Sequence, residues 1–189
     1  MTRVTLREAH VGDAPFLLGV WQDSLRMADP QDQLADLEFI IKAAAQSAEE
    51  RLVIAECDGE RAGAVFLRAT TFGPLNLEPT LQVHSPHVAP EFRRRGIGHA
   101  LMEAAASFAE SLGIGHIASA AASGSRDGNR YLARLGFGPQ AVFRVAPTAT
   151  MRGRLTASLP ATQRSARSRG NLGQVLAARR SMRRSQPTG

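Results

Sequence analysis

Cysteine, lysine and aromatic residues are scarce in this chain of 189 residues, which holds one cysteine, one tryptophan and one tyrosine. A single cysteine excludes an internal disulfide and any cysteine-rich metal site. That residue, Cys57, ends an apolar run, where we expect a buried small side chain rather than a reactive thiol. The composition therefore argues against a disulfide-stapled domain, and we expect no metal.

Long apolar runs are also missing. No stretch of apolar residues reaches the length of about 18 that a membrane-spanning helix needs. Residues 1–8 alternate polar and apolar side chains and lack the apolar core of a signal peptide. Hydrophobic residues make up 43% of the chain, which is normal for a globular domain. We therefore expect a cytoplasmic protein that does not associate with membranes.

Acidic residues are absent from the C-terminal part. Residues 151–189 contain nine arginines and no Asp, Glu or Lys. Because the net charge of the whole chain is +6, removing these nine charges leaves −3 for residues 1–150. We predict a domain over 1–150 and an Arg-rich tail over 151–189, flexible or partly helical. Within the tail, 152–169 is typical of a linker or extended arm, and 171–184 is compatible with a basic helix.

Hydrophobic periodicity divides the first 150 residues into ten elements. The predicted strands are Val4–Ala9, Leu52–Glu56, Ala62–Thr70, Thr80–Val88, Gly115–Ala121 and Gln140–Ala146. The predicted helices are Ala14–Arg26, Asp32–Ser47, Ile97–Leu112 and Arg126–Leu135. Asp58-Gly59 indicates a two-residue turn between the second and third strands. A strand–helix–strand unit from about Leu81 to Ala121 indicates a mixed α/β domain.

A basic, glycine-containing loop precedes the helix predicted to begin at Ile97. It reads Arg93-Arg94-Arg95-Gly96-Ile97-Gly98. The first N–H groups of a helix have no intrahelical partner, and the helix dipole adds partial positive charge there. Such a junction is a ready site for phosphate. The two glycines let a pyrophosphate approach the backbone, and the arginines add charge.

Two other glycine motifs do not fit this loop. A P-loop needs Gly-Lys-Ser or Gly-Lys-Thr, and the chain has neither. A dinucleotide fingerprint needs glycine where Leu101 stands. The loop resembles instead the signature Arg/Gln-x-x-Gly-x-Gly/Ala of the GNAT family of N-acetyltransferases, which Arg93, Gly96 and Gly98 match.

The residues before and after the loop in the sequence also resemble those of the family. They include Val88 and Pro90 before it, the amphipathic helix after it, and Leu135-Gly136-Phe137 further on. The N-terminal strand followed by Gly12-Asp13-Ala14 is similar as well. The resemblance covers roughly residues 3–147. It implies a GNAT fold, an α/β architecture with a mixed, mostly antiparallel, twisted sheet of about six or seven strands flanked by helices, here with a basic C-terminal arm.

The resemblance also implies a function, the transfer of an acetyl group from acetyl-CoA to a primary amine by direct attack. The backbone of His87 and Val88 is expected to pair with the pantetheine arm, and the N–H groups from Arg94 to His99 to hold the pyrophosphate. A backbone N–H, that of Val88, is expected to stabilise the oxyanion. The candidate cofactor-binding residues are His87, Val88, Arg93, Arg94, Arg95, Gly96, Ile97, Gly98, His99 and Asn129.

The residue that would donate a proton to the leaving CoA thiolate is implied less directly by the resemblance. Members of the family often carry a tyrosine five residues before the Phe of Leu-Gly-Phe, where this chain has Leu132. Tyr131 lies one residue earlier, about 100° away on a helix, and it is our candidate acid. The family's usual asparagine is displaced too, since Ser125 holds its commonest position and Asn129 follows four residues later. Asn129 is a candidate to bind the pantetheine or a water.

The candidates for the general base, which would take a proton from the amine, lie on the strand before the loop. His84 and His87 are there, with Glu78 just upstream. Strand alternation predicts that the two histidines face opposite sides of the sheet. A histidine with a pKa near neutrality suits a base, and His84 is our candidate. A chain of waters to bulk solvent is the alternative.

The acceptor is a small-molecule amine or a protein amine. We expect the loop Thr71–Pro79 and the first two helices to shape its pocket. Homodimers are frequent in the family, so a homodimer is possible. Two other functions stay open: an acyl-CoA-binding module without catalysis, and a nucleic-acid-binding protein driven by the tail.

The Arg-rich tail allows three partners: nucleic acid through phosphate contacts, an anionic membrane surface, or the acidic domain itself or a second subunit. Aromatic residues are absent after Phe143, so base stacking has no support. We favour a flexible or domain-packed arm over nucleic acid.

Overall fold

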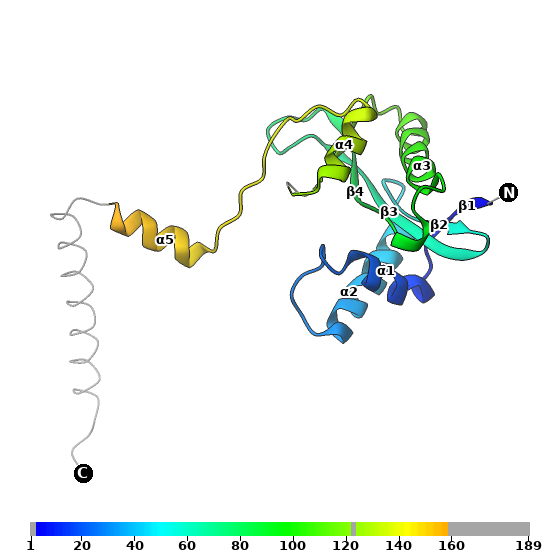
Figure 1. Cartoon of the computed structure of the whole chain (residues 1–189). Helices are drawn as coiled ribbons and strands as arrows, with labels where there is room; N and C mark the ends of the chain where they lie inside the picture. Colours follow the sequence, from blue (N-terminus) through cyan, green and yellow to red (C-terminus); the bar gives the residue numbers. More distant parts are fainter. Residues whose placement is uncertain (1–2, 122–123, 159–189) are drawn as a thin grey trace, which may run out of the picture. The chain divides into compact units, whose positions relative to one another are not determined.

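The computed structural model describes residues 3–121 and 124–158 (Figure 1). The chain divides into two compact units, Met1–Gly138 and Pro139–Gly189, and we describe each by itself. The first unit holds an α/β domain. The basic helix predicted for 171–184 lies outside the described residues.

A five-stranded sheet forms the centre of the first unit, with its strands side by side in chain order. The strands are β1 (Val4–Glu8), β2 (Glu50–Cys57), β3 (Glu60–Thr71), β4 (Pro79–Val88) and β5 (His116–Ser119). Neighbours from β1 to β4 are antiparallel, whereas β5 runs parallel to β4. Asp58 and Gly59, with φ of 54° and 88°, form the predicted turn between β2 and β3.

Helices cover both faces of this sheet (Figure 1). α1 (Ala14–Trp21) and α2 (Pro30–Ala45) pack on one face, and α3 (Ile97–Ser111) packs on the other. Successive strand residues point to opposite faces, so Ala64 joins the core under α1 and α2 while Val65 joins the core under α3. A fourth helix, α4 (Arg126–Arg134), follows β5. Within the described part of the chain, no helix is long and apolar enough to cross a membrane.

A buried carboxylate links β1 to the start of α1. Asp13 is fully buried and accepts hydrogen bonds from the Arg7 guanidinium at 2.7 and 2.9 Å and from the His10 N–H at 3.0 Å. Burial raises the pKa of Asp13, but these hydrogen bonds outweigh it and hold the pKa at about 2. Asp13 is therefore ionised at neutral pH and fixes how α1 leaves β1.

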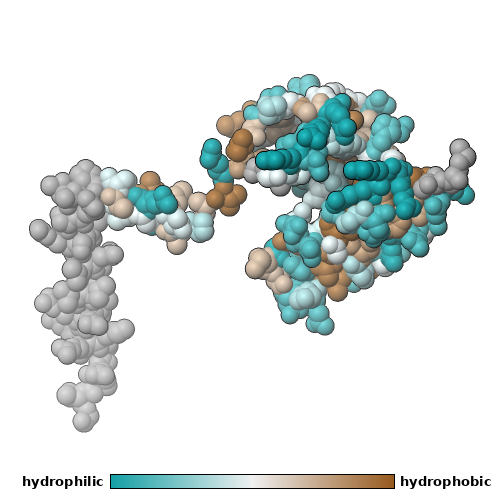
Figure 2. All heavy atoms as spheres, in the orientation of Figure 1, coloured by the Kyte–Doolittle hydropathy of each residue, from teal (hydrophilic) through white to brown (hydrophobic). Residues whose placement is uncertain are grey.

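Two predictions for the region after α4 are wrong. The segment Gln140–Ala146 forms no strand, and Val142, Phe143 and Val145 are exposed. Figure 2 shows exposed hydrophobic residues along the stretch that precedes α5. A strand needs a neighbour for its backbone N–H and C=O groups, and no such ladder forms in residues 139–158. The described sheet therefore has five strands rather than six or seven. α5 (Thr148–Ala157) includes residues 152–157, the start of the range in which we expected a linker or extended arm.

Candidate functional site

A bulge interrupts β4 in the middle of the sheet. One residue of β3, Val65, lies opposite two residues of β4, Ser85 and Pro86. Ser85 has a φ of 46°, and Pro86 has no N–H to donate. The indole N–H of Trp21 donates to the Ser85 carbonyl oxygen at 2.8 Å, and the Ser85 hydroxyl donates to that of Ser24 at 3.1 Å. The end of α1 therefore holds the bulge in place.

The bulge lies where β4 and β5 separate. The two strands pair from Thr80 and His116 to Val83 and Ser119, where the Ser119 hydroxyl also donates to the Val83 carbonyl oxygen at 3.1 Å. Beyond Val83, no further pairing of β4 with β5 occurs among the described residues. The C-terminal half of β4 therefore has one open edge.

Val88 turns its backbone toward this open edge. The Ala89 N–H donates to the Ala62 carbonyl oxygen at 2.9 Å. Hydrogen-bonded and non-hydrogen-bonded pairs alternate in an antiparallel ladder, so the next pair, Val88 with Gly63, is of the second kind. The N–H and C=O of Val88 therefore point away from β3. The same alternation turns the backbone of His87 toward β3, so His87 does not offer its backbone at this edge.

His84 and His87 lie on the same face of the sheet, contrary to the prediction. Directly paired residues share a face, and His84 pairs with Phe66 while His87 pairs with Ala64. Both partners pack toward α1 and α2. The rings of His84 and Phe66 lie 5.8 Å apart. The prediction fails because the bulge adds one residue and shifts the alternation.

Both histidines are uncharged at neutral pH. Burial lowers the pKa of His84, and the charge of Arg68 lowers it further. Burial and Arg93 lower the pKa of His87, against an opposing effect of Asp23. Since the ordinary pKa of histidine is about 6.5, each ring is neutral at pH 7. A neutral imidazole can accept a proton.

The loop after β4 presents a row of unpaired backbone donors. Among the described residues, the N–H groups from Arg94 to His99 have no hydrogen-bond acceptor, and the first helical bond runs from Ala100 to Gly96 at 3.0 Å. Arg94 and Gly96 have φ of 63° and 84°. Left-handed residues in such a turn make neighbouring N–H groups converge on one concave side. This arrangement suits an anion.

The three arginines of the loop have different surroundings. The Arg95 guanidinium lies 5.5 Å from the centre of the Phe92 ring and donates to the Cys57 sulfur at 3.9 Å. Cys57 is buried, as predicted. Arg93 and Arg94 are exposed and form no ion pair with any described residue. Two of the three guanidinium groups are therefore open to an anionic ligand.

The hydroxyl of Tyr131 lies beside Gly98. A Cβ added at Gly98 would stand 3.7 Å from the hydroxyl oxygen and 3.8 Å from the side chain of Val88. The hydroxyl is buried and has no hydrogen-bond partner among the described residues. Burial raises the pKa of Tyr131, and Arg134 opposes this only in part. Tyr131 is thus protonated at neutral pH, and its hydroxyl lies at the start of α3 without an acceptor.

Asn129 and Ser125 belong to the first turn of α4. The Ser125 hydroxyl accepts from the Gly128 N–H at 3.2 Å and caps the helix. The Asn129 side-chain amide donates to the Ser125 carbonyl oxygen at 2.7 Å. This contact stabilises the helix start, so Asn129 has a local structural role.

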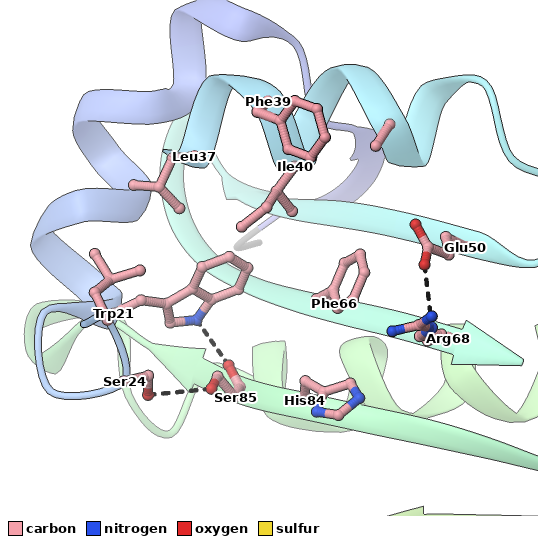
Figure 3. Close-up of a pocket in the computed structure, with 12 residues that line it drawn as sticks. Trp21, Ser24, Leu37, Phe39, Ile40, Glu50, Phe66, Arg68, His84 and Ser85 are labelled. Carbon is pink, nitrogen blue, oxygen red and sulfur yellow. Dashed lines mark hydrogen bonds and ion pairs between the residues drawn. The ribbon is translucent and has the colours of Figure 1, made fainter. Parts of the chain in front are cut away.

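A cavity of about 490 Å³ opens on the face that α1 and α2 cover (Figure 3). His84 and Ser85 line it, so it reaches the bulge. Residues of the first two helices line this cavity, whereas the loop Thr71–Pro79 contributes no lining residue. The lining residues are Trp21, Ser24, Leu25, Leu37, Phe39, Ile40, Ala43, Glu50, Phe66, Arg68, His84 and Ser85.

Sequence reasoning missed most of this cavity. Trp21 lies within the helix predicted over Ala14–Arg26, and neither it nor Glu50, Phe66 and Arg68 belongs to a motif. One signal was present, because a proline inside a strand, such as Pro86, is confined to edges and bulges. Residues 3–121 and 124–158 contain no cluster of three or more His, Cys, Asp or Glu side chains that could hold a metal ion.

Comparison with known families gives a match over the first unit. The profile described as "Acetyltransferase (GNAT) family" matches residues 16–137, a range that contains the bulge, the loop, Tyr131 and the whole cavity lining. A comparison with curated proteins gives no match.

Solved structures share the fold. A transcriptional regulator from Bacillus halodurans C-125 has a TM-score of 0.65 at 18% identity, covering 77% of this chain and 99% of that one. The aminoglycoside N-acetyltransferase AAC(6')-Iy, in complex with the bisubstrate analogue CoA-S-monomethyl-acetylneamine, has a TM-score of 0.62 at 19% identity with the same coverage. Glucosamine-6-phosphate N-acetyltransferase from Arabidopsis thaliana has 0.59 at 12% identity, again covering 77% and 99%. At these identities the likeness shows the fold alone.

Proposed function

Because the chain belongs to the GNAT acetyltransferase family, we propose that it transfers an acetyl group from acetyl-CoA to the nitrogen of a primary amine. One observation carries the proposal: the unpaired N–H groups from Arg94 to His99 lie next to the buried, unpartnered hydroxyl of Tyr131. The first feature suits a pyrophosphate, and the second offers a proton donor without an acceptor to a ligand that is bound beside it. AAC(6')-Iy, which shares the fold, has been solved with CoA.

The loop residues would hold the cofactor. The N–H groups of Arg94, Arg95, Gly96, Ile97, Gly98 and His99 would donate to the pyrophosphate. Arg93 and Arg94, which are exposed, would add charge-assisted contacts. Val88 would donate its free N–H at the open edge of β4, along which an extended arm can lie.

The chain's own groups then supply the proton transfers and the oxyanion contact. Bound acetyl-CoA provides the activated acetyl group as a thioester. His84, neutral and at the cavity wall, would accept the proton that the amine gives up as its nitrogen attacks. Val88 N–H would donate to the carbonyl oxygen as negative charge develops there. Tyr131 would donate its proton to the departing sulfur.

An acyl-CoA-binding module without catalysis is the alternative. It would use the same loop and would need neither His84 nor Tyr131. The feature that favours catalysis is the Tyr131 hydroxyl, a protonated donor without an acceptor among the described residues, beside the start of α3. A tail-driven nucleic-acid function depends mainly on residues 159–189, which lie outside the described part. The homodimer and the cytoplasmic location stay predictions.

Calorimetric titration with CoA, followed by thiol release from acetyl-CoA with a mixture of amines, tests the proposal. We expect saturable CoA binding, and thiol release only when amine is present. Gly96→Glu should abolish both, because it places a bulky anion at the anion-binding loop. Gly59→Glu is the matched control, since Gly59 also has a positive φ with open space around it but lies in the β2–β3 turn. CoA binding without amine-dependent release would favour the non-catalytic module, and absent binding would overturn both.

A further inference from the structure

The cavity under α1 and α2 adjoins the place where the acetyl group would be delivered. His84 and Ser85 line the cavity and lie at the bulge. Past the bulge, Val88 offers its N–H at the open edge of the same strand. A molecule in the cavity can therefore present one end to the bulge while the rest of it lies against α1 and α2.

The body of the cavity is mainly apolar. In Figure 3 the side chains of Trp21, Leu37 and Ile40 reach from the helices toward the strands that carry Phe66 and His84. Phe39 also lines the cavity, and its side chain is 72% exposed. An aromatic ring left in water beside a cavity gains from being covered by an apolar ligand.

The polar groups of the cavity are already paired with one another. Glu50 forms an ion pair with Arg68 at 3.2 Å. The Trp21 indole and the Ser24 hydroxyl are bound to Ser85. Figure 3 shows these contacts as dashed lines at the edge of the apolar space. The lining thus has no net charge.

His84 differs from the other polar groups of the cavity. Its ring is neutral at pH 7, contacts Phe66, and forms no hydrogen bond or ion pair with any described residue. One polar group that can accept a proton therefore stands at the bulge end, and an apolar space extends from it.

We propose that the acceptor is a small primary amine attached to an apolar body of about the size of an aromatic ring. This inference rests on the acetyl transfer proposed above. The amine would lie at His84 and the body against Trp21, Phe39 and Phe66. A volume of about 490 Å³ is within the range of small-molecule sites, about 300–1,000 Å³.

The same lining disfavours the substrates that give two similar proteins their names, an aminoglycoside and glucosamine 6-phosphate. A polycationic amine needs several carboxylates, whereas the cavity has one, Glu50, which is paired with Arg68. A sugar phosphate needs an uncommitted cation, and Arg68 is the only guanidinium in the lining.

Binding can be measured without turnover. Trp21 is the only tryptophan of the chain and lines the cavity, so its fluorescence reports occupancy. We expect a saturable change with 2-phenylethylamine and none with spermidine, kanamycin or glucosamine 6-phosphate at equal concentration. Phe39→Ala should weaken binding of 2-phenylethylamine by about 10-fold or more. Phe72→Ala, an exposed phenylalanine outside the lining, should leave it unchanged.

Turnover gives the second readout. The kcat/KM for 2-phenylethylamine should exceed that for ethylamine by about 10-fold or more, and Phe39→Ala should reduce this ratio while leaving CoA affinity unchanged. Acetylation of spermidine, kanamycin, glucosamine 6-phosphate or a peptide amine that is faster than that of 2-phenylethylamine would overturn the inference. The proposed acetyl transfer would still hold in that case. CoA binding with no amine acetylated, but with a Trp21 response to 2-phenylethylamine, would overturn the proposed function and support the cavity assignment.

Discussion

The indole N–H of Trp21 donates a hydrogen bond of 2.8 Å to the carbonyl oxygen of Ser85. This contact joins the last residue of α1 to the bulge of β4 across 64 positions of sequence. The bulge sets both the open edge at Val88 and the shared face of His84 and His87. One side-chain donor therefore connects the core under α1 and α2 with the geometry of the candidate site.

Trp21→Phe should destabilise the fold and the site together. It leaves the Ser85 carbonyl without its donor and removes part of a buried ring, so we expect a loss of about 1–3 kcal/mol in the free energy of unfolding. Urea denaturation followed by circular dichroism measures this, and kcat/KM should fall as well. Ser24→Ala removes only the exposed hydroxyl contact to Ser85 and should have a much smaller effect. Equal effects of the two variants would contradict the assigned role of the indole.

Gly98→Ala should bind CoA more weakly without loss of stability. The added Cβ would meet Tyr131 and Val88 at ordinary contact distances, and alanine favours a helix over glycine by up to about 1 kcal/mol. The new methyl group would stand beside the Tyr131 hydroxyl, where the cofactor would approach the start of α3, so we expect Kd for CoA to rise about 10-fold or more by calorimetry. Gly19→Ala, at an open position of α1, is the control for helix propensity. Unchanged CoA affinity in Gly98→Ala would show that the cofactor does not approach Gly98.

Tyr131→Phe should lower kcat while stability and CoA affinity stay near those of the wild type. The hydroxyl has no partner among the described residues, so its removal costs no hydrogen bond there. Loss of a general acid typically reduces the rate by about 10²-fold or more. Steady-state kinetics measures the expected fall in kcat, and thermal denaturation measures the stability. Tyr131→Leu also loses ring packing and should be less stable. A kcat that survives in Tyr131→Phe would exclude Tyr131 as the acid.

His84 should set the acidic limb in the dependence of kcat on pH. Burial and Arg68 lower its pKa below the ordinary value of about 6.5, so a base at this position stays active until the pH falls below that value. In His84→Gln we expect a lower kcat, and we expect no acidic limb at pH values below about 6.5. His87→Gln should retain the limb, because His87 does not line the cavity. A limb that persists in His84→Gln would point to another base.

Asp13→Asn should destabilise the domain at neutral pH by about 1–3 kcal/mol, because the buried group loses its charge-assisted hydrogen bonds to Arg7, although Arg7 keeps its ion pair with Glu56. The folded-state pKa of about 2 lies below the unfolded value of about 3.9. The stabilisation is therefore fully present above about pH 4 and is lost as the pH falls through about 2. Unfolding curves at several pH values should show this decline in the wild type only. Asp36→Asn, which breaks an exposed ion pair with Arg26, should have a far smaller effect.

Local sequence patterns predicted most elements of the first unit. The helix predicted over Ile97–Leu112 is α3, Ile97–Ser111, because its apolar spacing and the preceding loop are local properties. The helix predicted to reach Arg26 ends at Trp21, where tertiary contacts to β4 begin. The strand predicted over Gln140–Ala146 does not form. A strand depends on a partner that periodicity does not reveal.

The sequence alone determined the loop from Arg93 to Gly98, since unpaired N–H groups at a helix start and a glycine at positive φ follow from adjacent residues. Only the tertiary structure decided the cavity, the shared face of His84 and His87, and the approach of Tyr131 to Gly98. The physical reason is that these features depend on contacts between residues far apart in the sequence. A bulge changes which way every later side chain of its strand points, and packing between distant segments decides which of them meet.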